Sequence, residues 1–171
     1  MSDALPNVSV AAQADDDQLG ILQRRRIEAN IIAPIYRIMC RELGEQKAAE
    51  IIHEAISEDA RKAGARFAAH EPGGANMRTF IAIQDLWKQD DALITTTVVE
   101  NDDEYVYEVH RCAYAEMYKE MGLADIGALL SCTRDEDFIV GYDPGIELTR
   151  TQTVMEGAPF CDFRYVRRGA T

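Results

Sequence analysis

The sequence predicts an α+β domain in which an antiparallel sheet of about four strands packs with an N-terminal helical region and with helices between its hairpins. Two observations carry this prediction. Apolar residues recur at helical spacing through the first half of the chain, and β-branched runs bounded by turn residues begin at residue 93. Helices grouped before and between two hairpins are typical of an antiparallel α+β arrangement.

Three helices are expected in the N-terminal half. The first covers residues 18–42, and Pro34 inside it predicts a kink or a break. The second covers 45–68 and the third 76–88, with Glu-Pro-Gly-Gly between them as a loop signal. Residues 1–17 lack such a pattern and are expected to form a flexible tail, which leaves 18–171 as a single domain.

The second half is expected to mix short strands with short helices. In chain order these are strand 93–99, strand 105–112, helix 113–121, helix 124–131, a charged loop around 134–137, strand 146–155 and strand 160–166. The four strands form two hairpins, which we expect to share one sheet with helices on one face.

The charge balance limits the possible partners. The net charge is −12, from 18 basic and 30 acidic residues, so the surface repels phosphate backbones and anionic membranes. The sequence has no apolar run near the ~20 residues of a membrane span and no secretory signal pattern. We therefore expect a cytoplasmic protein without nucleic-acid or membrane partners, in which a local arginine can still bind a small carboxylate.

Strand alternation groups three reactive side chains in the second predicted strand. Glu108, His110 and Cys112 are expected on one face, where a carboxylate, an imidazole and a thiol suit acid–base or nucleophilic chemistry, or metal binding. The alternative is that this face is simply the polar, solvated side of the strand.

The last two predicted strands offer a second group. Asp162 and Arg164 share one face of the final strand, whereas Cys161 shares the other with two aromatic residues. Arg150 and Arg164 would hold a carboxylate if both face a pocket, and the alternative is a surface ladder of Arg–Asp pairs.

The four cysteines form no CxxC motif, which speaks against a zinc ribbon or a thioredoxin-like site. Cys132 can have a lowered pKa, because Arg134 follows closely and a nearby cation favours the thiolate. An ordinary charged turn, with Asp135 among its acids, is the alternative reading of this segment.

Four motifs together resemble the L-2-amino-thiazoline-4-carboxylic acid hydrolase family: R-C-A-Y at 111–114, L-S-C-T-R-D at 130–135, L-T-R-T-Q-T at 148–153 and G-A-P-F-C-D-F-R at 157–164. The resemblance extends over residues 20–167 and includes R-R-R-I-E at 24–28. It implies a hydrolase that acts on a carbon–nitrogen bond other than a peptide bond and opens a cyclic amidine to an N-carbamoyl amino acid. For the substrate in the family name, the product is N-carbamoyl-L-cysteine.

Under this resemblance, each chemical role has candidates in the chain. We expect Cys161 or Cys132 as nucleophile, His110 as acid–base group, Asp135 or Asp162 as its orienting partner, Arg150 or Arg164 as carboxylate clamp, and Tyr114, Thr151 and Thr153 as further substrate contacts. No cofactor is required on this reading. The partner is a small carboxylate, and the apolar helix face with Ile31 and Ile35 leaves a homo-oligomer open.

The late strands are also similar to 4-vinyl-reductase-like small-molecule-binding domains, some of which hold zinc through Cys and an acid. The corresponding ligands here would be Cys112, Cys132 and Cys161, with Glu108 or His110. That resemblance implies a sensor module or a zinc hydrolase in which the metal activates water.

Overall fold

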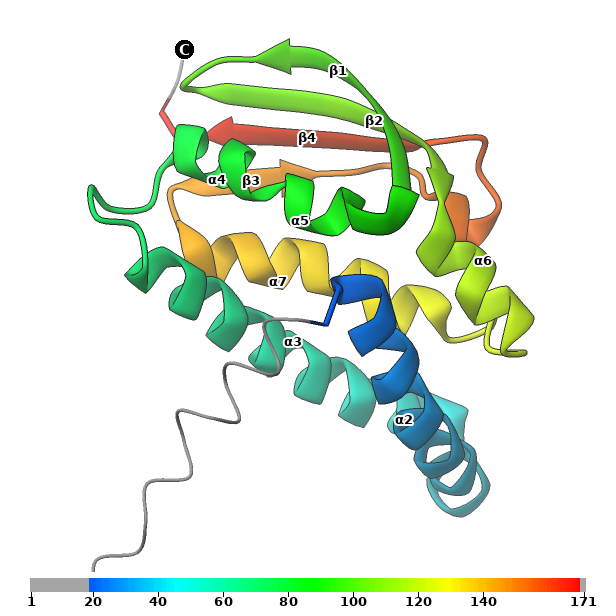
Figure 1. Ribbon diagram of the computed structural model, residues 1–171. Helices are drawn as coiled ribbons and strands as arrows, with labels where there is room; N and C mark the ends of the chain where they lie inside the picture. The colour runs from blue at the N-terminus through cyan, green and yellow to red at the C-terminus, as the bar shows by residue number, and fades with distance from the viewer. Residues whose placement is uncertain (1–18, 170–171) are drawn as a thin grey trace, which may run out of the picture.

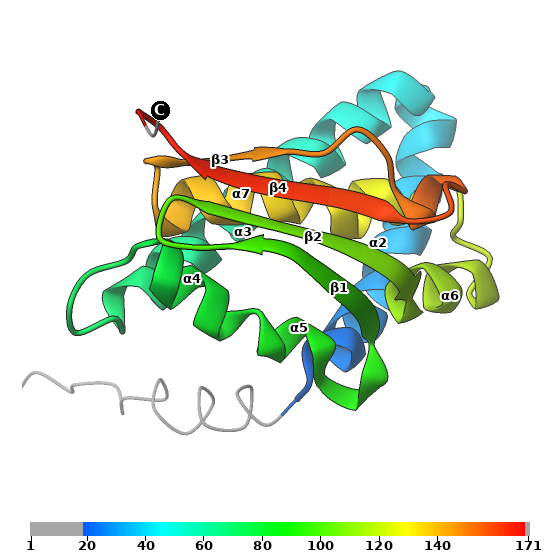
Figure 2. The same cartoon turned by 90° about the horizontal axis from the view of Figure 1, so that it is seen from above.

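The computed structural model describes residues 19–169, and the tail expected at 1–17 lies outside them. Its strands are β1 (Leu93–Glu100), β2 (Glu104–Cys112), β3 (Ile146–Thr149) and β4 (Cys161–Arg167). They form one antiparallel sheet in the order β1–β2–β4–β3, so the two predicted hairpins share a sheet. Helices cover one face of this sheet and leave the other open (Figures 1 and 2). The predicted α+β class is confirmed.

The helices precede the sheet and interrupt it in the expected order. They are α2 (Ile21–Leu43), α3 (Glu45–Ala69), α4 (Met77–Ile83), α5 (Asp85–Lys88), α6 (Ala113–Glu120) and α7 (Thr133–Tyr142), with short turns η1 (Gln89–Asp91), η2 (Ala128–Cys132) and η3 (Val154–Glu156). The expected third helix is divided at Gln84 into α4 and α5. Within residues 19–169, no helix has both the length and the apolar character to cross a bilayer.

Pro34 does not break the first helix, because α2 continues from Ile21 to Leu43. Proline removes one backbone donor, which would otherwise serve the carbonyl group of Asn30. Both Asn30 and Pro34 are exposed. Water can therefore satisfy the freed carbonyl, and the helix continues past the proline.

The charged segment expected to be a loop is instead the start of α7, the helix that lies between the sheet and α3 (Figure 1). Asp135 and Glu136 lie in its first turn, where the helix dipole favours negative charge. The same helix buries Phe138, Ile139 and Tyr142. A charged run at a helix N-terminus was therefore mistaken for a turn.

Two glycines let α7 approach α3 closely. A Cβ atom at Gly64 would lie 2.1 Å from the carbonyl oxygen of Phe138, and one at Gly141 would lie 2.1 Å from the carbonyl oxygen of Arg61. No real Cβ atom tolerates such a distance, so glycine is required on both sides of the crossing. This contact fixes α7, and with it the residues of its first turn, beneath the sheet.

One face of the sheet is aromatic and buried. Tyr105, Tyr107 and Val109 of β2 face the helices, as expected, and so do Cys161, Phe163 and Tyr165 of β4. The expectation that Cys112 shares the face of His110 is wrong. The β1–β2 register shifts between Ile94, which pairs with Arg111, and Thr95, which pairs with Val109. This bulge skips His110 and turns Cys112 toward the helices.

The strand expected at 146–155 is shorter than predicted: β3 ends at Thr149. The backbone N–H groups of Thr151 and Gln152 then donate to the carboxylate of Asp162, at 3.0 and 2.9 Å, and the backbone leaves the β3–β4 ladder. The side chain of Arg150, at the start of this irregular segment, is only 7% exposed.

Candidate active site

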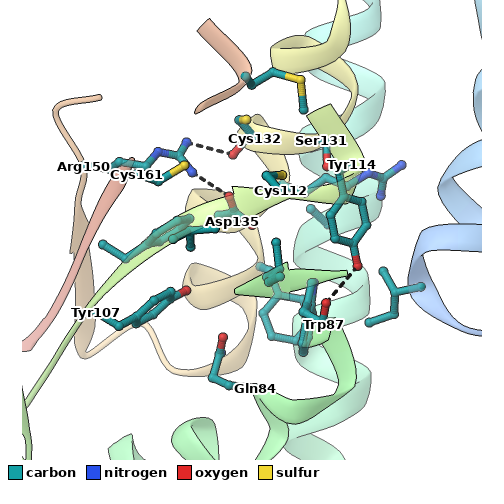
Figure 3. Close-up of a pocket in the computed structure, with 18 of the residues that line it drawn as sticks. Gln84, Trp87, Tyr107, Cys112, Tyr114, Ser131, Cys132, Asp135, Arg150 and Cys161 are labelled. Carbon is teal, nitrogen blue, oxygen red and sulfur yellow. Dashed lines mark hydrogen bonds and ion pairs between the residues drawn. The ribbon is translucent and has the colours of Figure 1, made fainter. Parts of the chain in front are cut away.

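A cavity of about 90 Å³ lies between the buried face of the sheet and the helices (Figure 3). Two hydrophobic clusters make up the core of the described residues, one around α2 and α6 and one around α7 and the sheet. The cavity lies where they meet, and its lining draws on both. This volume is below the roughly 300–1,000 Å³ of pockets for drug-sized ligands, so the cavity as it stands suits only a very small molecule.

Aromatic rings form much of the cavity wall. Tyr107 and Phe163 stack with centroids 4.8 Å apart and planes 7° from parallel, and Trp87 meets Phe138 edge to face at 5.2 Å. The hydroxyl of Tyr114 also lines the cavity region and donates to the carbonyl oxygen of Trp87 at 3.3 Å. Flat, apolar walls of this kind favour a flat ring as ligand.

A buried ion pair, Arg150–Asp135, breaks this apolar lining (Figure 3). Nη1 of Arg150 donates to Oδ2 of Asp135 at 2.6 Å, and Nη2 donates to the carbonyl oxygen of Cys132 at 3.1 Å. The guanidinium carbon lies 4.9 Å from the centre of the Phe163 ring. Hydrogen bonds and ring contact together hold the guanidinium in one orientation.

Burial and charge act in opposite directions on this pair. Burial raises the pKa of the Asp135 carboxyl above its usual range, although Arg150 opposes the shift. For Arg150, burial is the largest influence and acts downward, but the charge and hydrogen bond of Asp135, together with Cys132 and Tyr165, outweigh it and raise the pKa of the guanidinium, which stays positive. A buried carboxyl with a raised pKa in a pocket is a candidate for proton transfer.

Three thiols from separate elements line the same cavity: Cys112 at the end of β2, Cys132 at the end of η2 and Cys161 at the start of β4 (Figure 3). Burial raises the pKa of all three, that of Cys112 to about 11. The cation favouring a Cys132 thiolate was expected to be Arg134. Arg150 does act in that direction on Cys132, but burial prevails. The resting thiols are therefore protonated at neutral pH.

Two further arginines, Arg25 and Arg134, line the cavity and were not among the expected site residues. Arg134 donates to Asp59 at 2.6 Å, to Glu28 at 3.2 Å and to the carbonyl oxygen of Leu130 at 3.1 Å. Arg25 also pairs with Glu28. The signal that could have found Arg25 was the R-R-R-I-E motif at 24–28, which names no single residue.

A shallower groove of about 390 Å³ borders the cavity, and Cys132 and Arg150 line both. The expected substrate contacts Thr151 and Thr153 line this groove, together with His53 and Glu136. Arg150 therefore forms part of the partition between the cavity and the groove. Tyr114 is on the cavity side.

The open face of the sheet holds the other expected site residues. Nε2 of His110 lies 3.5 Å from Glu108 and 3.1 Å from Oγ1 of Thr96. Arg164 is 60% exposed and donates to Glu104 at 2.8 Å. Arg150 and Arg164 consequently point to opposite sides of the sheet, and the joint carboxylate clamp expected of them does not form.

Asp162 lies outside the cavity but shapes its wall. Besides two backbone N–H groups, the Thr151 hydroxyl donates to it at 2.6 Å. Burial acts upward on the pKa of Asp162, yet these hydrogen bonds prevail and lower it. The carboxylate thus anchors the segment that immediately follows Arg150.

The alternative set of metal ligands is not brought together. Glu108 and His110 lie on the open face, whereas the three cysteines line the cavity. Within the part of the chain that the structure describes, no three His, Cys, Asp or Glu side chains are grouped to hold a metal ion.

Comparisons with known proteins add two findings. A family model described as L-2-amino-thiazoline-4-carboxylic acid hydrolase matches residues 24–165. A solved structure of the phenol-responsive sensory domain of the transcription activator PoxR, with phenol, is similar with a TM-score of 0.52 and 10% identity, over 81% of this chain and 73% of that one. At this identity the likeness shows the fold alone. A search of curated proteins found no match.

Proposed function

Because this chain belongs to the L-2-amino-thiazoline-4-carboxylic acid hydrolase family, we propose that it hydrolyses a small cyclic amidine bearing a carboxylate, and that Asp135 directs the attacking water. The observation that carries this proposal is the Arg150–Asp135 pair in the wall of a largely aromatic cavity. The pair supplies an oriented carboxyl group where a flat ring fits.

Atom balance defines the reaction for the substrate in the family name. Its amidine carbon bears a ring nitrogen, an exocyclic nitrogen and the ring sulfur. Water adds its oxygen to this carbon, one proton goes to the ring nitrogen and the other to the departing sulfur. N-carbamoyl-L-cysteine keeps both nitrogens, so the bond that breaks is carbon–sulfur, in place of the carbon–nitrogen bond expected from the resemblance.

Asp135 can carry the proton through these steps. As a carboxylate it accepts one proton from water during attack, and as a carboxylic acid it returns that proton to the sulfur, while the second water proton passes from the added oxygen to the ring nitrogen. Arg150 fixes the carboxyl orientation at 2.6 Å. Because the pKa of Asp135 is raised, turnover should increase as the pH rises through that pKa and the base form accumulates.

The protonated state of the cavity thiols supports water as the nucleophile. A thiol attacks only as its thiolate, and burial disfavours the thiolate of Cys112, Cys132 and Cys161. Cys161 or Cys132 as a covalent nucleophile is the competing mechanism. It would require substrate binding to reverse this effect of burial.

Turnover of L-2-amino-thiazoline-4-carboxylate, followed by chromatography and mass spectrometry of N-carbamoyl-L-cysteine, tests the proposal. We expect Asp135→Asn to lower kcat/KM by about 100-fold or more, the usual contribution of a general base. Asp102→Asn is the matched control, because Asp102 forms an exposed ion pair with Arg78 at 2.8 Å, and it should change kcat/KM less than about twofold.

Two results would contradict the proposal. One is an Asp135→Asn variant that keeps more than half of the wild-type turnover. The other is a wild-type protein that binds the thiazoline without converting it, which would place the chain with binding or sensor domains.

A further inference from the structure

The charged side chains that line the cavity are mostly cations. Three arginines line the cavity, Arg25, Arg134 and Arg150, against one acid, Asp135. The counter-charges of Arg25 and Arg134 are Glu28 and Asp59, which are not part of the lining. Their side chains are 30% and 55% exposed, so water screens them. The network is balanced as a whole, three arginines against Asp135, Glu28 and Asp59, but three of its cations and only one of its anions are part of the cavity lining.

Two of the three arginines are held by contacts across elements. Arg150 is bound to Asp135 and to the backbone at Cys132. Arg134 is bound to Asp59, to Glu28 and to the backbone at Leu130, and only 10% of its side chain is exposed. Moving either guanidinium toward a ligand would break hydrogen bonds that join separate parts of the fold.

Arg25 is placed differently. It lies one turn into α2, and the same Oε2 atom of Glu28 that it contacts also accepts from Arg134. One carboxylate oxygen thus serves two guanidinium groups, and Arg134 has Asp59 as a further partner, so Arg25 shares its carboxylate at this corner of the cavity. The side chain of Arg25 is 15% exposed, so water competes little with a ligand there.

The surroundings place Arg25 near one side of the cavity. Burial raises the pKa of Tyr114 and of Tyr118, and the charge of Arg25 lowers both. The Tyr118 side chain also interacts with Ser131. Figure 3 shows Tyr114 and Ser131 on the side of the cavity away from Arg150. The charge of Arg25 also acts on the pKa of Asp135, so a ligand in the cavity can meet both groups.

We propose that Arg25 binds the carboxylate of the substrate and so makes the cavity selective for ring compounds that carry an anionic group, an inference that deepens the proposed hydrolase function and rests on it. Arg150 then orients Asp135, and the clamp role expected of it passes to Arg25. A planar guanidinium can bind a carboxylate through two parallel hydrogen bonds.

Substrate discrimination measures this role. We would determine kcat/KM of the wild type and of Arg25→Gln for L-2-amino-thiazoline-4-carboxylate and for 2-amino-thiazoline, which lacks the carboxylate. Arg25→Gln should lower kcat/KM for the carboxylate about 10- to 100-fold, mainly through KM, and change that for 2-amino-thiazoline less than about twofold. Arg26→Gln is the matched control, because Arg26 is the next residue and its side chain is 50% exposed.

Binding provides a readout that does not require turnover. Trp87 lines the cavity and is the single tryptophan of the chain, so its fluorescence can follow the binding of N-carbamoyl-L-cysteine. We expect the Kd to rise about 10- to 100-fold in Arg25→Gln and to stay unchanged in Arg26→Gln. If the wild type binds in this Arg25-dependent way but turns nothing over, the hydrolase proposal fails while the role of Arg25 stands.

The opposite pattern overturns the inference. If the wild type turns over the thiazoline carboxylate and Arg25→Gln does so with unchanged KM, another group binds the carboxylate. If Arg25→Gln fails to fold, Arg25→Lys decides, because lysine keeps the charge toward Glu28 but lacks the planar fork. Weaker binding of the carboxylate ligand by Arg25→Lys supports the inference, and equal affinity overturns it.

Discussion

The two faces of the sheet carry similar ion pairs in opposite environments. Arg150 meets Asp135 at 2.6 Å on the buried face, and Arg164 meets Glu104 at 2.8 Å on the open face. The exposed fractions of the two arginine side chains are 7% and 60%. The two pairs hardly differ in length, so the difference lies in burial, which is the main cause of the raised pKa of Asp135 and which places the first pair at a cavity. An ion pair therefore indicates a candidate active site only where it is buried beside a cavity.

Removing one arginine from each face should give the largest contrast. Arg150→Met removes the counter-charge and the hydrogen bond of a buried carboxyl group, which typically costs about 3 kcal/mol or more, whereas Arg164→Met should cost less than about 1 kcal/mol. Urea unfolding of both variants measures these free energies. Equal losses would mean that the buried pair is hydrated like a surface pair.

Asp162 links the two faces, and its removal should have an intermediate effect. Asp162→Ala removes the acceptor of three hydrogen bonds from Thr151 and Gln152, so we expect a loss of about 1–2 kcal/mol in the free energy of unfolding. If Asp162 positions Arg150, the variant should also lower kcat for the thiazoline while KM changes little. Unchanged kcat would limit Asp162 to a structural role.

The stability difference between the wild type and Asp162→Ala should depend on pH. The pKa of Asp162 is lowered by folding. Its stabilising effect is therefore fully present above the ordinary aspartate pKa, about 3.9, and is lost as the pH falls through the lower folded pKa. The difference in stability between wild type and Asp162→Ala should shrink in that acidic range and stay constant from about pH 5 to 8.

His110 should give the smallest effect, although the sequence made it the expected acid–base residue. His110→Ala removes contacts to Thr96 and Glu108 on the open face. We expect kcat/KM to change less than about twofold and the free energy of unfolding by less than about 1 kcal/mol. A loss of activity beyond tenfold would mean that the open face takes part in the reaction.

The sequence predicted best where one periodic pattern governs a segment. Alternation in β4 correctly placed Cys161 and Asp162 on opposite faces. It failed in β2, because a bulge at His110 changes the face of Cys112 and alternation cannot reveal a bulge. The start of α7 was missed because its acids, Asp135 included, resemble a charged turn in sequence while they suit a helix N-terminus.

The assembly of the candidate site could not be predicted in the same way. Cys112, Cys132 and Asp135 were among the expected residues, but no local pattern shows that they meet at one cavity. Their meeting depends on the close crossing of α3 and α7, where Gly64 and Gly141 allow backbone contact. Arg25 reaches the cavity from α2, more than a hundred residues before Asp135.

The most direct test of the central claim compares Asp135 with the cavity thiols in one assay. The rate of N-carbamoyl-L-cysteine formation would be measured for Asp135→Asn and, separately, for Cys112→Ser, Cys132→Ser and Cys161→Ser. Our account predicts that Asp135→Asn retains about 1% of the wild-type kcat/KM or less and that each serine variant retains at least about a tenth. An active Asp135→Asn together with one inactive serine variant would contradict it and would identify a cysteine as the nucleophile.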